Sequence, residues 1–216
     1  MGLRERKKEL TRQQIMETAW RLFSERGFDR VTVTEIAREA QVGPATIFNY
    51  FPAKEDLFYS GLDEFGARLV AAVSGRAAGE PVIAAVRRFL LESGGLLEAI
   101  AEGDEEALSR ARAVHRVISE STALQAREAQ AFTRLTADLG RAIAADTGDE
   151  TTARVAAGAL VGVHRAMVDL ARVRVLSDDR VRDLAGDVRR YGERAFTLLA
   201  GGLQDYAPRS PRADRP

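Results

Sequence analysis

The stretch that decides the fold reads Thr32-Val-Thr-Glu-Ile-Ala-Arg-Glu-Ala-Gln-Val-Gly-Pro-Ala-Thr-Ile-Phe-Asn-Tyr-Phe-Pro-Ala-Lys-Glu-Asp-Leu-Phe58. Thr32 and Glu35 have the spacing of a capping box, and Val31 with Ile36 supplies the matching hydrophobic staple. Together these two signals predict that a short helix begins here and runs over residues 33–40.

A second short helix is predicted after only three more residues. Residues 41–43 are too few for anything but a tight turn, and Pro44 suits the first position of a helix over residues 44–50. Two short helices across such a turn are typical of a helix-turn-helix, whose second helix can enter the ~12 Å wide major groove of DNA.

The outward face of this second helix has unusual chemistry. Ile47 and Phe51 are four residues apart and are predicted to face the core, which leaves Phe48 and Asn49 outside. An exposed phenylalanine is unfavourable unless something covers it. DNA would place the ring against thymine methyl groups and let Asn49 reach a base edge. Plain packing of two helices is the alternative that this pattern leaves open.

The rest of the chain is also predicted to be helical. Apolar residues follow helical spacing over residues 11–26, and Gly27 suits the C-cap of that helix. A fourth helix is expected from residue 52 or 53 to about 74. Further helical segments are expected at 81–101, 105–119, 122–146, 150–174 and 178–202. Because nothing alternates with period two over a useful length, we expect an all-α fold without a sheet.

Composition limits the class of protein. The 216 residues are 30% charged and 45% hydrophobic, an ordinary balance for a soluble globular chain. The longest uncharged run, residues 40–53, is shorter than the ~20 apolar residues that span a bilayer, and nothing resembles a signal peptide. We therefore expect a cytoplasmic protein that contacts no membrane. The absence of cysteine excludes disulfides and cysteine-based metal sites.

Charge is unevenly distributed along the chain. The net charge of zero argues against a general nucleic-acid coat protein. Residues 1–12 nevertheless carry five basic and two acidic side chains, an excess of three positive charges. We interpret residues 1–10 as a basic N-terminal arm that follows phosphates or enters a minor groove, with a solvated tail as the alternative. Residues 207–216 are predicted to be a disordered tail.

The segment quoted above closely resembles the DNA-binding signature of the tetracycline-repressor (TetR) family, and residues 19–28 resemble the end of that family's first helix. The resemblance covers roughly residues 11–60. It implies a homodimeric regulator with a helix-turn-helix DNA-binding domain at residues 11–52. A larger helical domain at residues 53–206 would then bind a ligand and form the dimer. The implied function is that of a repressor which a small, largely apolar effector releases from a palindromic operator.

The family's DNA contacts carry over by position. The resemblance implies phosphate contacts at Thr32, Thr34, Tyr50 and Lys54, and a base-reading surface made of Pro44, Ala45, Thr46, Phe48 and Asn49. Two positions depart from the family pattern, because Gly43 and Ala53 stand where capping residues are frequent. Each missing cap costs ~1 kcal/mol of helix stability, but neither departure removes a base-reading group.

The last two helices, expected at 150–174 and 178–202, are predicted to form the dimer surface. The resemblance favours a four-helix bundle with two helices from each subunit. Gly158 and Gly162 lie one turn apart on one face and would let two backbones approach closely, and Val163 and Leu170 are expected at the same interface. Ordinary packing within the chain is the alternative.

A ligand cavity is expected among the helices from 54 to 174. Its candidate lining residues are Phe65, Leu69, Phe89, Leu97, Val114, Ile118, Phe132, Leu135, His164 and Met167, for each of which core packing is the alternative role. His115 and His164 lack the spacing of a metal pair, so neither a metal nor a cofactor is predicted.

An enzyme is not expected. The chain has no Gly-x-Ser-x-Gly motif, no phosphate loop and no dinucleotide fingerprint. The stronger rival to a DNA-binding regulator is a helical carrier for a hydrophobic small molecule. A carrier would need the interior cavity, but it would have no use for the exposed side chains between residues 46 and 54.

Overall fold

The computed structural model describes residues 2–92, 104–177 and 184–202 of the chain. Regular structure in these ranges is helical, with no strand. The helices are α1 (Leu3–Arg26), α2 (Val33–Glu39), α3 (Pro44–Tyr50), α4 (Asp56–Ser74), α5 (Val82–Glu92), α7 (Glu105–Ser119), α8 (Thr122–Thr147), α9 (Glu150–Leu176) and α10 (Leu184–Gly201). The all-α prediction is therefore confirmed for the described ranges.

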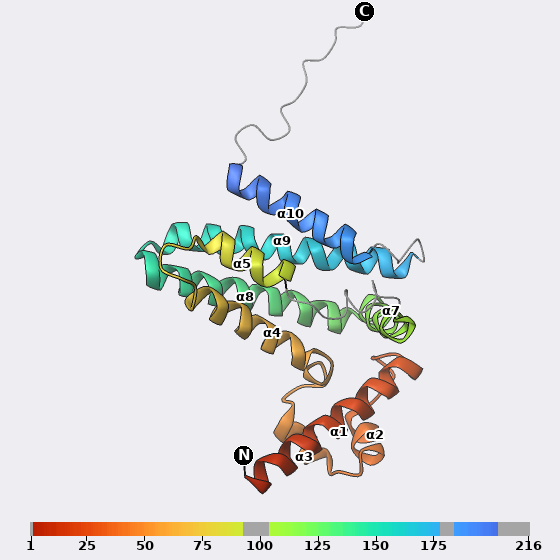
Figure 1. The fold of residues 1–216 in the computed structure, drawn as a ribbon. Coiled ribbons are helices and arrows are strands. Elements are labelled where there is room, and N and C mark those ends of the chain that lie inside the picture. Colours follow the sequence, from red (N-terminus) through yellow and green to blue (C-terminus); the bar gives the residue numbers. More distant parts are fainter. Residues whose placement is uncertain (1, 93–103, 178–183, 203–216) are drawn as a thin grey trace, which may run out of the picture.

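The helices form two packed groups (Figure 1). Helices α1, α2 and α3 make a small N-terminal group, and α4 leads from it into a larger one. In the larger group α8 and α9 run side by side, with α4 against α8 and α10 against α9. Helix α7 lies at the end of the larger group that is nearest to α1, so it touches both groups.

The helix-turn-helix forms through the local signals that its sequence contains. The Thr32 hydroxyl accepts a hydrogen bond from the Glu35 amide at 3.2 Å, and the Glu35 carboxylate accepts from the Thr32 amide at 2.8 Å. Val31 and Ile36 are both buried, as the staple requires. In the turn Gln41 adopts a positive φ of 56°, and the Val42 amide donates to the carbonyl of Ala37 at 2.9 Å. These hydrogen bonds end α2 and fix the direction in which α3 leaves the turn.

Two helix starts differ from the sequence expectation. Helix α1 begins at Leu3, not near residue 11, so residues 3–10 continue the helix instead of forming a separate arm. Helix α4 begins at Asp56, later than residue 52 or 53, because residues 52–55 form a tight connection. The Asp56 carboxylate accepts a hydrogen bond from the Ala53 amide at 3.0 Å, which holds this connection. The segment predicted at residues 207–216 and parts of two predicted helices (93–101 and 178–183) lie outside the described residues.

Two hydrophobic cores correspond to the two groups. The N-terminal core is built around Phe23, Phe28 and Phe58, and it also takes in Ile118 and Leu124 from α7 and α8. The C-terminal core lies between α4, α5, α7, α8, α9 and α10. The two groups are joined by apolar contacts as well as by the chain, so a shift of α7 or α8 would reach the helix-turn-helix directly.

Candidate DNA-binding surface and interior ligand site

The recognition surface predicted on α3 is exposed. Pro44, Ala45 and Asn49 face solvent, Phe48 is 51% exposed, and Thr46 is half-buried. Ile47 and Phe51 are buried in the N-terminal core, which confirms the predicted orientation of the helix. Gly43 caps α3 through its backbone alone, since it has no side chain to accept a hydrogen bond. An apolar ring beside an amide therefore stands on the outer face of a short, anchored helix.

The residues with predicted phosphate contacts lie in different environments. Thr34 is exposed, and Tyr50 is half-buried with its ring 6.4 Å from that of Phe51. The Thr32 hydroxyl is already engaged, because it donates to the Glu35 carboxylate at 2.8 Å in addition to its capping role. Thr32 is thus first of all a helix cap, and a phosphate would have to share its hydroxyl.

Lys54 has an intramolecular partner that the sequence did not suggest. Its Nζ donates to the backbone carbonyl of Phe28 at 2.7 Å and lies 4.1 Å from the centroid of the Phe28 ring. Burial lowers the pKa of Lys54, against the opposing effect of the Asp29 and Glu55 charges. Lys54 therefore ties the connection before α4 to the end of α1, and this is a structural role in addition to any contact with DNA.

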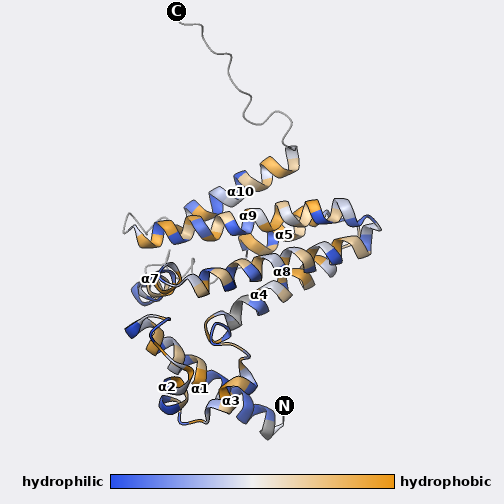
Figure 2. Ribbon diagram, turned by 180° about the vertical axis from the view of Figure 1, so that it is seen from behind, coloured by the Kyte–Doolittle hydropathy of each residue, from blue (hydrophilic) through white to orange (hydrophobic). Residues whose placement is uncertain are grey.

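Basic residues extend the exposed surface of α3. Figures 1 and 2 both show the N-terminal end of α1 next to α3, on the side of the molecule far from α9 and α10. Arg6, Lys7 and Lys8 are exposed on the first turns of α1. The first turns of α1, which carry these positive residues, thus lie next to α3.

Four of the predicted ligand-lining residues meet in the interior and form what we call the aromatic wall: Phe65, Phe89, Phe132 and His164. The His164 ring stacks on Phe65 with centroids 4.8 Å apart and meets Phe132 edge-on at 5.5 Å. Phe89 contacts Phe65 at 5.3 Å. Burial lowers the pKa of His164 to about 4, so the imidazole is neutral at pH 7.

The other predicted lining residues divide into three groups. Leu69, Leu135 and Met167 belong to the same core as the aromatic wall. Ile118 and Val114 pack with the N-terminal core instead. Leu97 lies outside the described residues. A pocket of about 260 Å³ between α4 and α8 is lined by Phe132 and Leu135 and also by Asp63.

A cluster of charged side chains, centred on buried Arg127, lies on the same helices, and no pattern in the sequence indicates it. The Arg127 guanidinium, 7% exposed, pairs with Asp56 at 3.1 Å and with Asp63 at 2.7 Å. Arg172 pairs with Glu128 at 2.6 Å. Helical spacing could not separate these residues from ordinary surface charges, because their burial depends on how α4, α8 and α9 pack.

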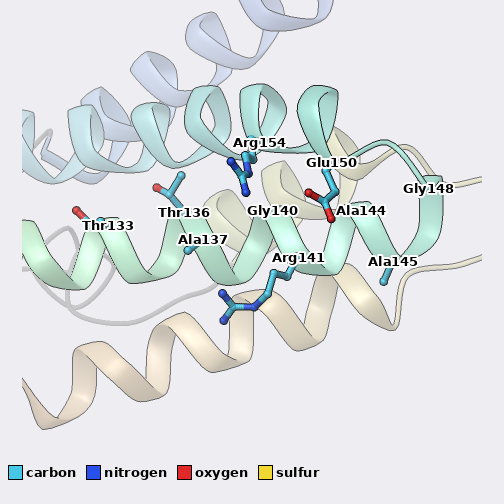
Figure 3. Close-up of a pocket in the computed structure, with 10 residues that line it drawn as sticks. All are labelled: Thr133, Thr136, Ala137, Gly140, Arg141, Ala144, Ala145, Gly148, Glu150 and Arg154. Carbon is cyan, nitrogen blue, oxygen red and sulfur yellow. The ribbon is translucent and has the colours of Figure 1, made fainter.

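A larger groove of about 980 Å³ lies along the outside of α8 and α9 (Figure 3). Small and polar residues line it, including Gly140, Ala144 and Thr136, with Glu150 and Arg154 contributed by α9. None of the predicted ligand-lining residues takes part in this groove, so the interior remains the candidate ligand site. Within the described ranges no three histidine or acidic residues gather as metal ligands.

An apolar stripe on α9 faces solvent. Val155 is 69% exposed and Val173 is 63% exposed, with Gly158 and Gly162 exposed between them. A Cβ atom added at either glycine would meet nothing within 4 Å. Val163, by contrast, is buried in the C-terminal core. The predicted interface position at Val163 was therefore wrong, since its side chain packs into the core of its own subunit.

Comparison with known proteins identifies the family. Residues 15–60 match the family model of bacterial regulatory proteins, tetR family. The chain is 32% identical over 148 residues to the HTH-type transcriptional regulator TcmR of Streptomyces glaucescens, an alignment that covers 68% of this chain and 65% of TcmR. It is 52% identical over 46 residues to the HTH-type transcriptional regulator LuxR of Vibrio harveyi, or 21% of this chain and 22% of LuxR.

Residues 15–60 of the chain belong to the tetR family. The match spans somewhat less than two thirds of the length of TcmR and about a fifth of the length of LuxR. The relatives carry the names of transcription regulators and not of enzymes, in agreement with the sequence prediction that this chain is not an enzyme.

Solved structures of the tetR family share the fold. NalD of Pseudomonas aeruginosa, the secondary repressor of the MexAB-OprM multidrug efflux pump, aligns over 88% of this chain and 96% of its own, with a TM-score of 0.56 and 21% identity. A tetR-family protein of Syntrophomonas wolfei aligns over 88% and 97%, with a TM-score of 0.53 and 18% identity. At these identities the likeness concerns the fold. None of the described helices is long and apolar enough to cross a bilayer.

Proposed function

We propose that this chain is a cytoplasmic repressor that binds operator DNA as a homodimer and releases it when a small molecule enters the C-terminal core. The observation that carries the proposal is the pairing of exposed Phe48 with exposed Asn49 on α3. In the major groove the ring would cover thymine methyl groups, and the amide would bond to a base edge. The neighbouring basic turns of α1 would meet phosphates, whose charge is the same at every base pair.

The homodimer is supported by the apolar stripe of α9. A stripe that contains Val155, Val173 and two exposed glycines is unfavourable in water unless a partner covers it. A second copy, related by two-fold symmetry, would cover it with the same stripe. Two recognition helices would then contact half-sites about one helical turn, roughly 34–36 Å, apart.

Ligand response is supported by the way the two groups of helices are joined. Ile118 and Leu124 belong to the N-terminal core, and the Ser121 hydroxyl donates to the Asp29 carboxylate at 2.7 Å. Helix α4 connects the helix-turn-helix to the interior. A ligand that binds one arrangement of α4, α7 and α8 more tightly shifts the population of DNA-competent dimers, and operator DNA must weaken ligand binding by the same factor.

Binding to the DNA upstream of the chain's own gene tests the proposal directly. We expect fluorescence anisotropy to show tight binding to this duplex and weaker binding to a scrambled one, with Phe48→Ala reducing the difference. Gln130→Ala, an exposed change on α8, serves as the matched control and should bind like the unchanged protein. A carrier of small molecules, the rival function, would bind both duplexes equally weakly.

A further inference from the structure

The buried polar cluster contains more hydrogen-bonding atoms than its own residues use. Tyr59 Oη, His115 Nδ1, Arg127 Nη1 and Arg172 Nε are buried and have no partner. They come from α4, α7, α8 and α9 in turn. Buried polar atoms without partners are costly, and folded proteins nearly always satisfy them with protein, water or ligand. Four such atoms in one cluster indicate a place where another molecule supplies the missing bonds.

The four side chains that carry these atoms also lie near one another. Tyr59 feels the charges of Glu128, Arg172 and Arg127, and burial together with Glu128 raises its pKa, so the phenol stays protonated and can donate. Burial and the Arg172 charge lower the pKa of His115 to about 4, so the imidazole is neutral at pH 7. The cluster therefore offers donors from a phenol and two guanidinium groups.

The charges in the cluster determine which kind of ligand it can bind. Both arginines are already paired, Arg127 with Asp56 and Asp63, and Arg172 with Glu128. Asp169, more exposed, lies 3.6 Å from Arg172 as well. These four carboxylates outnumber the two guanidinium groups, so an anion would gain no net electrostatic attraction from the cluster. A neutral oxygen acceptor can take the unused N–H and O–H donors without competing with these ion pairs.

The aromatic wall continues from this cluster along the same helices. Tyr59 and Phe65 are six residues apart on α4, and Arg127 and Phe132 are five apart on α8. The rise of 1.5 Å per helical residue separates the two layers by about 7.5–9 Å there. A pocket between α4 and α8 touches both layers, because Asp63, the partner of Arg127, and Phe132 of the aromatic wall both line it. This length suits a molecule of two or three fused rings.

We propose that the polar cluster binds a carbonyl or similar oxygen of an uncharged, mainly apolar molecule whose ring system packs on the aromatic wall. This inference rests on the proposed ligand response and narrows its effector to a class. The ketone or quinone oxygen would accept from Tyr59 and from an arginine. The neutral imidazole of His164, stacked on Phe65, would contact the rings.

Three dyes of different chemistry test the proposal on the full chain. Nile red is uncharged and has a carbonyl oxygen, diphenylhexatriene is an uncharged hydrocarbon, and anilinonaphthalene sulfonate is an anion. We expect saturable binding of Nile red, weakened about three- to tenfold by Tyr59→Phe and by Arg172→Lys, the range expected for one lost hydrogen bond. Tyr59→Phe keeps the ring, and Arg172→Lys keeps the charge opposite Glu128, so both should fold. Diphenylhexatriene should bind all variants alike.

Tyr191→Phe, at a tyrosine that is 40% exposed on α10, is the control and should change nothing. The proposal is overturned if Nile red shows no saturable binding, if Tyr59→Phe leaves its affinity unchanged, or if the sulfonate dye binds more tightly and loses more affinity in Arg172→Lys. DNA anisotropy with and without Nile red separates this inference from the proposed function. Cluster-dependent dye binding with unchanged DNA affinity would support the site and reject the ligand response.

Discussion

The ammonium group of Lys54 donates to the carbonyl of Phe28 at 2.7 Å and sits 4.1 Å above the same residue's ring. These two interactions with Phe28 hold the lysine against the segment that directly follows α1. A position that the family resemblance assigns to a phosphate contact thereby also stabilises the connection between the helix-turn-helix and α4. The structural role predicts that substitution lowers stability, and the phosphate contact predicts that it lowers affinity for DNA.

Lys54→Met is expected to lower the free energy of unfolding by about 1 kcal/mol, because it removes a charge-assisted hydrogen bond at a half-exposed site and keeps the apolar stem. Urea denaturation of the two proteins measures the difference. Had Lys54 been a residue of the first turn of α4, its charge would oppose the helix dipole and the change would stabilise. An increase in stability would therefore contradict the structural role.

Asn49→Ala and Phe48→Ala should separate specificity from affinity. Both side chains are exposed, so the free energy of unfolding should stay within about 0.5 kcal/mol of its original value. Asn49→Ala should lose about 1–3 kcal/mol of binding on the operator and little on scrambled DNA. Anisotropy on both duplexes across a salt series measures the loss. Equal losses on the two duplexes would place Asn49 on phosphates instead of base edges.

Gly43→Ser should stabilise the protein by about 0.3 kcal/mol, since it supplies the hydroxyl that α3 lacks at its N-cap. The backbone there is extended, and an added Cβ would meet only Thr46 Oγ1 at 3.7 Å, an ordinary contact. Thermal denaturation should show a higher melting temperature. A lower melting temperature would show that the turn before α3 tolerates no side chain.

Val173→Glu should convert the dimer to a monomer with little loss of helix, because Val173 is 63% exposed in one chain. Light scattering at micromolar concentration measures the mass, and circular dichroism measures helix content. Val163→Glu is the contrasting variant, as a charge in the C-terminal core should unfold the subunit itself. A dimer that survives Val155→Glu and Val173→Glu together would mean that another surface forms the interface.

Acid should destabilise the protein partly through His164. Its pKa is about 4 in the folded chain against 6.5 for an ordinary histidine, so the unfolded chain binds the extra proton. Stability should be unaffected by this group above pH 6.5 and should fall as pH drops towards 4, by up to about 3 kcal/mol. His164→Phe keeps a ring on Phe65 and should reduce the slope of the curve between pH 6.5 and 4, with the remaining slope due to His115, whose pKa is also lowered to about 4. Identical pH profiles for the two proteins would show that His164 charges freely when folded.

The helix-turn-helix could be predicted from sequence because its signals are local. The capping box of Thr32 and Glu35, the three-residue turn and Pro44 act within a few residues, and the observed α2 and α3 follow them closely. The exposed and buried sides of α3 followed from helical periodicity alone. The start of α1 was less predictable, since the largely charged residues 3–10 lack the apolar periodicity that indicates a helix.

Tertiary packing decided everything that depends on which helices meet. Lys54 turns inward because the end of α1 brings the Phe28 carbonyl within its reach, 26 positions away in the sequence. Arg127 is buried because Asp56 and Asp63 of α4 lie against α8. Sequence by itself determined α2, α3 and the exposed face of α3, where the relevant forces act within one or two turns. The interior polar cluster and the exposed face of α9 depend on contacts between helices that are far apart in the sequence. The charge pattern and periodicity of a single helix do not contain this information.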